Sequence, residues 1–421
     1  MKNAIHRPGS SSAGPTRREF MKVAVGGAAL VAAGLPRFAG GQGGEPIRVG
    51  LIVPLTGPYG AEAQDQVRGA ELAIKQFNDA GGAMGRKAEL LVRDDKMNPA
   101  EGATRAIELI EKDKAAFIVA PLSAAVQLAI NNVTKQRKII FNSISVSDAI
   151  NEAKDWSKYT FHEALPSFAI AGAVARHAIP KMGKKVVFLT ADYAYGHEMV
   201  RGFQAVGIPL GMEVLSEIRH PVGQTDYSSY FPRIQALKPD ILIVSSFGQD
   251  QLNAFKQITD FGLKAQMKVV APQLVFTRRI AGGPEPYKGI IGATPYYWSL
   301  EDTIPSAKKF NEAFQAMHKR LPSDYGAVAY SGVRGLLTAA TNAGSTESDK
   351  VVDALAALKY DFNRGPQFFR DCDHQSVQSV MVIESKDKAD MKNEFDVFRI
   401  VSTEPADVAR LRTCEALGFK A

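Results

Sequence analysis

The stretch IRVGLIVPLTGPYG, residues 47–60, begins a pattern that decides the fold of this chain. Its first eight residues are almost continuously apolar and rich in β-branched side chains, as in a strand that is buried on both faces. Seven similar runs follow it: AELLVRD (88–94), AAFIVAP (115–121), KIIFNS (138–143), KVVFLT (185–190), DILIVSS (240–246), MKVVAP (267–272) and GIIGATP (289–295). We therefore expect eight strands in sheets that are covered on both sides.

Helical patterns separate these strands. The segment 98–112, NPAEGATRAIELIEK, begins with an asparagine N-cap followed by proline at the first helical position. The pair Gly81-Gly82 ends a second predicted helix. Apolar residues at helical spacing mark one face of that helix: Val67, Ala70, Ala73, Ile74 and Phe77. The alternation predicts βαβ units in parallel, doubly wound sheets. Because these units recur before residue 165 and again over 185–292, we expect an α/β protein with two Rossmann-like lobes.

The first forty residues differ from the rest of the chain. In TRREFMKVAVGGAALVAAGL (16–35), two arginines precede 13 uncharged residues, fewer than the roughly 20 needed to span a bilayer. This arrangement is typical of a signal peptide, and the arginine pair fits a twin-arginine export signal. A buried N-terminal helix is the alternative, although three glycines would weaken it. We expect residues 1–41 to be removed near Ala39-Gly40-Gly41 and the remainder to be exported.

The net charge of the exported part is small. The whole chain carries +7, but residues 1–44 contain six lysines and arginines against one glutamate, which leaves only +2 for the rest. The excess of basic over acidic residues therefore gives little support for a nucleic-acid partner. No later stretch is apolar enough to predict a membrane span. The remaining length, about 380 residues, exceeds one comfortable hydrophobic core and implies two domains.

The chain contains two cysteines, Cys372 and Cys414. In an oxidising compartment such a pair favours a disulfide, and two separate buried thiols are the alternative. Closing this loop would contribute about 4 kcal/mol to stability in the chain-entropy description. No Cys-x-x-Cys is present and only His374 lies close in sequence, so we expect no zinc site.

No catalytic or cofactor motif is complete. No G-x-G-x-x-G follows a strand, GGAMGRK (81–87) lacks the spacing of a P-loop, and G-x-S-x-G is absent. His162-Glu163 and His197-Glu198 lack the second histidine of a zinc-protease motif, and Asp94-Asp95 is interpreted as a structural pair at a strand end. We therefore expect no enzyme activity, no cofactor and no metal.

Polar and aromatic residues follow six of the predicted strands directly. One serine after a strand is better explained as a helix cap. Six such loops together favour a ligand site, because the carboxyl ends of parallel strands form a crevice in which hydroxyls and helix N-termini suit an anion. The loops are 54–59, 122–123, 142–145, 192–196, 245–248 and 272–274.

Four segments carry a resemblance to a known family: VGLIVPLTGPYG, RGAELAIKQFNDAGGAMGRKAELLVRDDKMNPAEGA, TADYAYG and PDILIVSS. In this order they resemble type I periplasmic solute-binding proteins of ABC importers, in the leucine-binding-protein-like group for branched-chain amino acids and amides. The resemblance implies a periplasmic protein with two lobes, three hinge crossovers and a cleft between the lobes. It places lobe one at 42–166 and 293–366, and lobe two at 167–292 and 367–421.

The resemblance also implies a ligand site. In amino-acid binders of this family, hydroxyls and amides after the third and fourth strands hold the ligand carboxylate, and these positions are occupied here by Ser123, Ser143 and Ser145. Tyr195 matches the aromatic residue that covers the ligand. We therefore expect the site to bind a carboxylate.

The residues that meet the ammonium group in this family are largely missing. Phe168 stands where an acid follows Pro-Ser, Gln273 stands where a glutamate is expected, and Glu62 replaces the aromatic of the first loop, with Tyr59 nearby. A buried ammonium without a carboxylate is costly. We therefore expect an acid with an apolar or aromatic body.

Aromatic residues are expected to stack against that body: Phe168, Tyr195, Phe247 and either Phe276 or the run Tyr296-Tyr297-Trp298. Packing at the lobe hinge is an equal alternative for the last run. Glu62 as a substitute acid would keep amino acids and amides among the ligands.

The resemblance implies a monomeric solute-binding component that delivers a small carboxylate to the permease subunits of an ABC importer. A periplasmic sensor subunit for a membrane kinase or chemoreceptor is the alternative, with the same fold and site. An enzyme is disfavoured because no nucleophile–base pair occurs.

Overall fold

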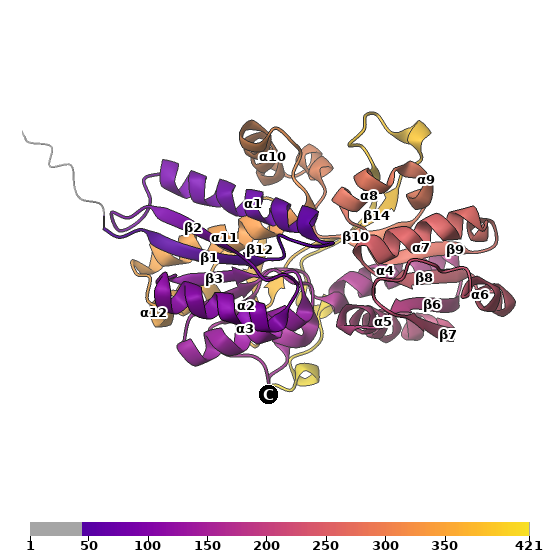
Figure 1. Cartoon of the computed structure of the whole chain (residues 1–421), viewed down its shortest axis with the longest axis horizontal. Coiled ribbons are helices and arrows are strands. Elements are labelled where there is room, and N and C mark those ends of the chain that lie inside the picture. The colour runs from indigo at the N-terminus through magenta and orange to yellow at the C-terminus, as the bar shows by residue number, and fades with distance from the viewer. Residues whose placement is uncertain (1–43, 421) are drawn as a thin grey trace, which may run out of the picture. The chain divides into compact units, whose positions relative to one another are not determined.

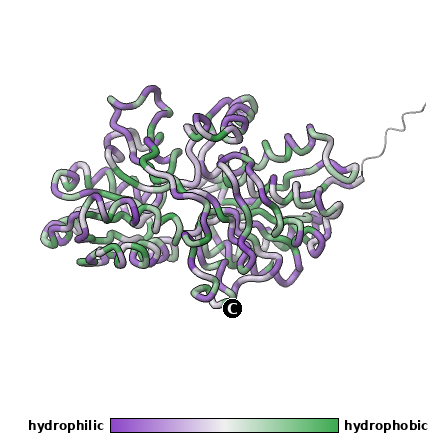
Figure 2. The backbone as a smooth tube through the Cα atoms, turned by 180° about the vertical axis from the view of Figure 1, so that it is seen from behind, coloured by the Kyte–Doolittle hydropathy of each residue, from purple (hydrophilic) through white to green (hydrophobic). Residues whose placement is uncertain are grey.

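Two β-sheets, one parallel and one mixed, with helices on both faces make up the part of the chain described by the computed structural model, residues 44–420 (Figure 1). The predicted signal peptide, its arginine pair and its cleavage site lie outside the described residues. None of the helices in residues 44–420 is long and apolar enough to cross a membrane. Hydrophobic segments run through the middle of both lobes, where the strands lie (Figure 2).

The first sheet is parallel throughout, in the order β2-β1-β3-β4-β5. Its strands are β1 (Ile47–Val53), β2 (Ala88–Asp94), β3 (Phe117–Ala120), β4 (Ile140–Ser143) and β5 (Thr160–His162). Helices α1 and α11 pack together, as do α2 and α3. The helices of this lobe are α1 (Gly60–Asp79), α2 (Pro99–Ile107), α3 (Ala124–Arg137), α10 (Pro305–His318), α11 (Asp324–Ala343) and α12 (Ser348–Ala356).

The second sheet has the order β15-β14-β10-β9-β8-β6-β7, and β14 runs antiparallel to both of its neighbours, β10 and β15. Its strands are β6 (Lys185–Ala191), β7 (Glu213–His220), β8 (Ile241–Ser245), β9 (Lys268–Gln273), β10 (Ile291–Thr294), β14 (Val380–Ser385) and β15 (Phe398–Glu404). Its helices are α4 (Ser167–Met182), α5 (Ala194–Gly207), α6 (Phe231–Leu237), α7 (Gly248–Asp260), α8 (Phe276–Gly282) and α9 (Pro284–Tyr287).

The predicted α/β class with two Rossmann-like parallel sheets is confirmed, and each of the eight predicted strands forms. Most of the strands that sequence reasoning missed are short or partly exposed, and β14, a buried strand of six residues, is the exception. β7 lies at the edge of its sheet and most of its residues are half-buried, so it lacks a continuous apolar run. β5 has only three residues.

The chain passes between the two sheets where β5 leads into α4, where β10 leads toward α10, and between β13 and β14. The expected boundary at 292/293 runs through β10, because this strand pairs with β9 and β14 of the second sheet. Residues 367–377, expected in lobe two, lie instead against the first sheet through a bridge between His162 and Gln375. They belong to a small sheet of β11 (Lys359–Tyr360), β12 (Gln367–Phe369) and β13 (Ser376–Val377).

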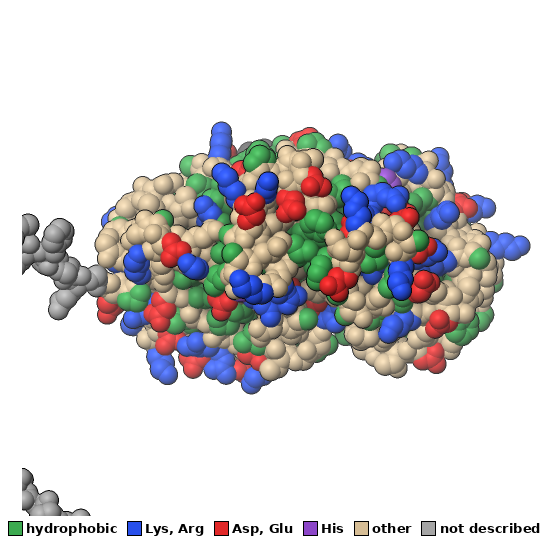
Figure 3. Space-filling view, turned by 90° about the horizontal axis from the view of Figure 1, so that it is seen from above, with side chains coloured by type: hydrophobic (Ala, Val, Ile, Leu, Met, Phe, Trp, Pro, Cys, Tyr) green, Lys and Arg blue, Asp and Glu red, His purple; other side chains and the backbone are tan. Residues whose placement is uncertain are grey.

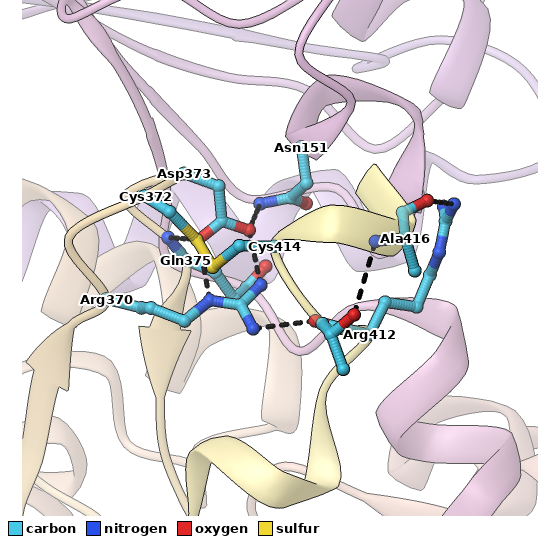
Figure 4. Close-up of a disulfide and its surroundings, with 9 residues drawn as sticks. Asn151, Arg370, Cys372, Asp373, Gln375, Arg412, Cys414 and Ala416 are labelled. Carbon is cyan, nitrogen blue, oxygen red and sulfur yellow. Dashed lines mark hydrogen bonds and ion pairs between the residues drawn. A yellow bond between two sulfur atoms is a disulfide. The ribbon is translucent and has the colours of Figure 1, made fainter. Parts of the chain in front are cut away.

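The C-terminal tail returns from the second sheet to the first lobe. After β15, the carbonyl of Leu417 accepts a hydrogen bond from Ala153 N (2.9 Å), and the ring of Phe419 packs edge-on against Trp156. A disulfide joins Cys372, next to β12, to Cys414 in this tail, which confirms the predicted pairing (Figure 4).

An arginine–aspartate ion pair next to the disulfide also holds the C-terminal tail. Arg370 donates to both carboxylate oxygens of Asp373 and to the carbonyl of Arg412, two residues before the tail cysteine (Figure 4). Asn151 also donates to Asp373 (3.0 Å). Charged and covalent contacts therefore hold the tail against the first lobe.

Candidate ligand-binding cleft

A cavity of about 150 Å³ lies where the carboxyl ends of strands from the two sheets face each other. Segments from the first lobe and from the second lobe both line it, so the cavity belongs to the seam between them. Among the described residues, no Asp, Glu, Lys or Arg lines it. The lining consists of Tyr59, Met97, Leu122–Ala125, Ile144–Ser147, Tyr193–Tyr195, Phe247 and Tyr325.

The polar side of the cavity is formed by the start of α3 and the loop after β4. Ser123 is the N-cap of α3, but its side chain makes no capping hydrogen bond. The backbone N–H groups of Ala124 and Ala125, in the first turn, have no hydrogen-bond partner within residues 44–420. A helix N-terminus with free N–H groups carries a partial positive charge, so this side of the cavity suits an anion.

The three predicted serines take different places around this polar side. Ser123 and Ser145 line the cavity, and the Ser145 hydroxyl donates to the carbonyl of Leu122 (3.1 Å), which ties the two loops together. Ser143 is fully buried and does not line the cavity. Its Oγ accepts from Gln127 Nε2 (2.9 Å) and from Ser145 N (3.3 Å). Ser143 therefore fixes the loop that carries Ser145.

Aromatic rings from both lobes form the other side. The Phe247 ring lies 5.3 Å from Tyr59 of the first lobe and 5.7 Å from Tyr195 of the second, and Tyr193 stacks on Tyr195 at 5.9 Å. Burial raises the pKa of Tyr59 to about 12 and raises the pKa of Tyr195 further. These phenols are therefore neutral at physiological pH and keep their protons for hydrogen bonding.

Glu62 does not line the cavity. It is fully buried on α1 and accepts a charged hydrogen bond from Arg278 Nη2 (2.7 Å) and one from Thr277 Oγ1 (3.0 Å), both on α8 of the second lobe. Arg278 also donates to the carbonyl of Pro58. The predicted substitute acid is therefore engaged in an ion pair that joins the lobes.

The Glu62–Arg278 ion pair lies beside a surface hollow of about 350 Å³, which Phe276, Thr277 and Ile280 line from the second lobe. Seen from above, the molecule shows hydrophobic side chains gathered near the middle of this face, with basic and acidic side chains around them (Figure 3).

Several other predicted residues lie outside the cavity. Phe168, the second residue of α4, lines a different hollow together with Leu411 and Arg412 of the C-terminal tail. Gln273 ends β9 as a buried residue, and its carbonyl accepts from Gln251 Nε2 (3.0 Å). The geometry thus groups Tyr59, Ser123, Ser145, Tyr195 and Phe247, and it separates Phe168, Gln273, Glu62 and Ser143 from them.

The aromatic run that follows β10 also lies outside the cavity. The Tyr297 hydroxyl accepts from the backbone N–H of Val397 (3.0 Å) and Phe398 (3.2 Å), and the Tyr296 ring packs edge-on against Phe310. Phe276 lies 6.0 Å from Tyr297. This geometry matches the packing alternative rather than stacking on a ligand.

Sequence reasoning missed several lining residues, among them Tyr193, Ser147, Tyr325 and Met97, for two different reasons. Tyr193 belongs to the loop 192–196, which was already singled out, so the signal was present there, whereas Ser147 lies two residues beyond the predicted loop 142–145. Tyr325 begins α11, far along the chain from the other loops, and Met97 follows the buried Asp95. No local pattern marks these last two residues, because only the packing of α11 and β2 brings them to the cavity.

The chain belongs to the periplasmic binding protein family, whose pattern it matches over residues 46–390. The Leu/Ile/Val-binding protein BraC3 of Rhizobium johnstonii is 26% identical over 74% of this chain and 83% of its own length. A periplasmic binding protein from Burkholderia mallei is 27% identical, with a TM-score of 0.81 over 88% of this chain and 97% of that structure. The resemblance inferred from the sequence is confirmed, and the fold is that of type I periplasmic binding proteins.

A further structure is similar in fold. A solute-binding protein of an ABC transporter from R. palustris, in complex with benzoate, has a TM-score of 0.76 at 22% identity and covers 86% of this chain and 97% of its own. These proteins bind solutes, and the periplasmic family supports an extracytoplasmic location for this chain.

Proposed function

We propose that this protein is the solute-binding component of an ABC importer and captures a small carboxylate that has no α-ammonium group. One observation carries the proposal: the cavity offers serine hydroxyls and free backbone N–H groups on one side and aromatic rings on the other, with no carboxylate among the described lining residues. An α-amino acid would bury its ammonium there without a negative partner, which is costly.

The ligand carboxylate would lie at the start of α3. The free N–H groups of Ala124 and Ala125 and the Ser123 hydroxyl can each donate to it, and a charge-assisted hydrogen bond contributes about 1.5–3 kcal/mol. The helix N-terminus adds a favourable field for an anion. This side therefore sets the orientation of the ligand.

The body of the ligand would lie among the aromatic rings. A cavity of about 150 Å³ is the size that takes a single benzene ring in an apolar protein core. Because Tyr59 belongs to the first lobe and Phe247 to the second, and their rings contact each other, a ligand ring packed against this pair contacts both lobes and favours their closed arrangement. A closed, loaded form is what the permease would receive.

The similar fold of a benzoate-bound transporter component supports an aromatic acid, whereas relatives named for leucine, isoleucine and valine favour an amino acid. Calorimetry separates the two. We expect benzoate, 3-phenylpropanoate or 4-methylpentanoate to bind, and phenylalanine and leucine to bind at least a hundredfold more weakly. Tight binding of an amino acid without binding of these acids would overturn the proposal.

The serine contact has its own test. We expect Ser123→Ala to weaken binding of the best of these acids by about tenfold to a hundredfold, because a charge-assisted donor is lost. Ser228→Ala, in a loop of the second lobe away from the cavity, is the control and should leave the affinity unchanged. An unchanged affinity in Ser123→Ala would place the carboxylate elsewhere.

A further inference from the structure

The tyrosines on the aromatic side of the cavity offer hydroxyl groups with which a ligand ring without polar substituents cannot form hydrogen bonds. The hydroxyls of four lining tyrosines make no hydrogen bond with any group in residues 44–420: Tyr59, Tyr193, Tyr195 and Tyr325. By contrast, the buried hydroxyls of Tyr227 and Tyr330 donate to Asp250 O (3.1 Å) and to Gln76 Oε1 (2.7 Å). Of these four, only the Tyr195 hydroxyl oxygen is buried; buried polar groups normally have partners, so this hydroxyl calls for an explanation.

Tyr195 is the strongest case among the four. The residue is 7% exposed, and its hydroxyl oxygen is fully buried without a hydrogen-bond partner in the described part of the chain. Its ring lines the cavity between Tyr193 and Phe247. A phenol in this position loses its hydrogen bond to water and gains none from the protein, so a ligand oxygen that reached it would supply the missing partner.

The second lobe adds further donors at the same place. α5 begins at Ala194 without a side-chain cap, and the backbone N–H groups of Ala194 and Tyr195 have no partner within residues 44–420. Burial keeps the phenols protonated, so each can donate as well as accept. A ligand oxygen on this side of the ring would therefore meet several donors.

We propose that the ligand is an aromatic acid with an oxygen substituent on its ring, such as a hydroxybenzoate, and that Tyr195 is the residue that selects for this oxygen. This inference rests on the proposed function, because it assumes that a carboxylate occupies the start of α3. The carboxylate then binds to the first lobe and the ring oxygen to the second, so both ends of the ligand hold the lobes together.

Calorimetry with matched benzoates tests the inference. The 3- and 4-hydroxybenzoates are compared with 3- and 4-methylbenzoate, because a methyl group is close to a hydroxyl in size and makes no such hydrogen bond. In the unaltered protein we expect at least one hydroxybenzoate to bind tenfold or more tightly than its methyl analogue. In Tyr195→Phe we expect this ratio to fall to threefold or less.

Tyr287→Phe is the matched control. Tyr287 also has a buried hydroxyl without a partner in the described residues, but it lies on α9 and does not line the cavity. This variant should keep the hydroxyl-to-methyl ratio of the unaltered protein. Thermal unfolding of both variants checks that each is folded.

Two outcomes would overturn the inference alone. One is a methylbenzoate that binds as tightly as its hydroxy analogue in the unaltered protein, which requires no variant. The other is a ratio that stays the same in Tyr195→Phe. Failure of all four benzoates to bind, with tight binding of an amino acid, would overturn the proposed function as well.

Discussion

Asp95, at the end of β2, is a carboxylate that the fold buries beside the cavity. It is 0% exposed, and one of its oxygens accepts from Met97 N (2.8 Å), while the other has no partner in residues 44–420. Burial raises its pKa from the ordinary 3.8 to about 6. Its contact fixes the backbone of Met97, which lines the cavity, so the structural interpretation of the Asp94-Asp95 pair agrees with this geometry.

The raised pKa predicts a pH dependence of stability. Between about pH 4 and pH 7 the folded state holds the Asp95 proton more tightly than the unfolded chain does, so this contribution is complete at low pH and is lost as the pH rises through 6. Asp95→Asn lacks it. We expect the unfolding free energy of the unaltered protein, relative to the variant, to fall by about 2.5 kcal/mol between pH 4 and pH 7.

Urea unfolding of both proteins at the two pH values measures this difference. Asp94→Asn is the control, because hydrogen bonds from Thr56, Lys96 and Leu55 outweigh burial and keep the pKa of Asp94 below its ordinary value. Asp94 therefore stays charged over this range. A difference between the unaltered protein and Asp95→Asn that does not change with pH would contradict the prediction.

At the scale of elements, α1 and α11 approach each other closely at a glycine. A Cβ atom added at Gly69 would lie 1.9 Å from the carbonyl oxygen of Gly326, a backbone atom that cannot move without shifting α11. Because Tyr325 precedes Gly326 and lines the cavity, this close approach also places a cavity residue. The contact between these helices therefore links the core of the first lobe to the site.

We expect Gly69→Ala to lower the free energy of unfolding by about 1–3 kcal/mol, because the added methyl overpacks the contact. Gly335→Ala on α11 is the matched control. Its added Cβ has no heavy atom closer than 3.9 Å, so it should be neutral or stabilise by up to about 1 kcal/mol through helix propensity. Chemical denaturation of both variants makes the comparison, and equal effects would refute the packing argument.

The contact between α1 and α8 joins the two lobes beside the cavity. The buried Glu62 pairs with Arg278, whose side chain is 13% exposed, so neither charge is well solvated. Removing one partner of such a pair leaves the other charge buried and uncompensated. The ion pair therefore favours the closed arrangement without touching a ligand.

We expect Arg278→Met to weaken binding of the best benzoate about tenfold, because the closed arrangement loses this contact. Lys75→Met, which removes an exposed ion pair with Asp79 on the outside of α1, should have no effect. Small-angle scattering of the free protein should show a larger radius of gyration for Arg278→Met only. Unchanged binding and scattering would show that the pair does not favour closure.

At the scale of the whole molecule, the disulfide ties the C-terminal tail across the lobes. The tail leaves β15 of the second sheet and is held to the first lobe at Cys372, whose partner is 42 residues away in sequence. Closing a loop of this length contributes about 4 kcal/mol in the chain-entropy description. We expect Cys372→Ser with Cys414→Ser to lose stability of that order in equilibrium unfolding.

The reducing agent provides the control for this prediction. Dithiothreitol should destabilise the unaltered protein to the level of the double variant and leave the double variant unchanged. A double variant as stable as the oxidised protein would show that tail packing, through Phe419 and Leu417, suffices without the covalent link.

The sequence by itself determined the fold class, the positions of eight strands, the cysteine pair and the loops that reach the cleft, although β2 is half-buried at the edge of its sheet. Each of these depends on local properties. A strand buried on both faces needs a continuous apolar run, a capped helix needs Asn98 and Pro99 at its start, and a loop after a parallel strand lies at the crevice whatever the rest of the chain does.

Only the tertiary structure decided which side chains of those loops line the cavity. Ser143 and Ser145 are two residues apart, yet one lies behind the loop and the other faces the cavity. Glu62 forms an ion pair with Arg278 of α8, more than two hundred residues further along the chain, and the packing of α11 brings Tyr325 to the cavity. These positions depend on how distant helices pack and on how the lobes meet, and neither leaves a periodic signal in the sequence.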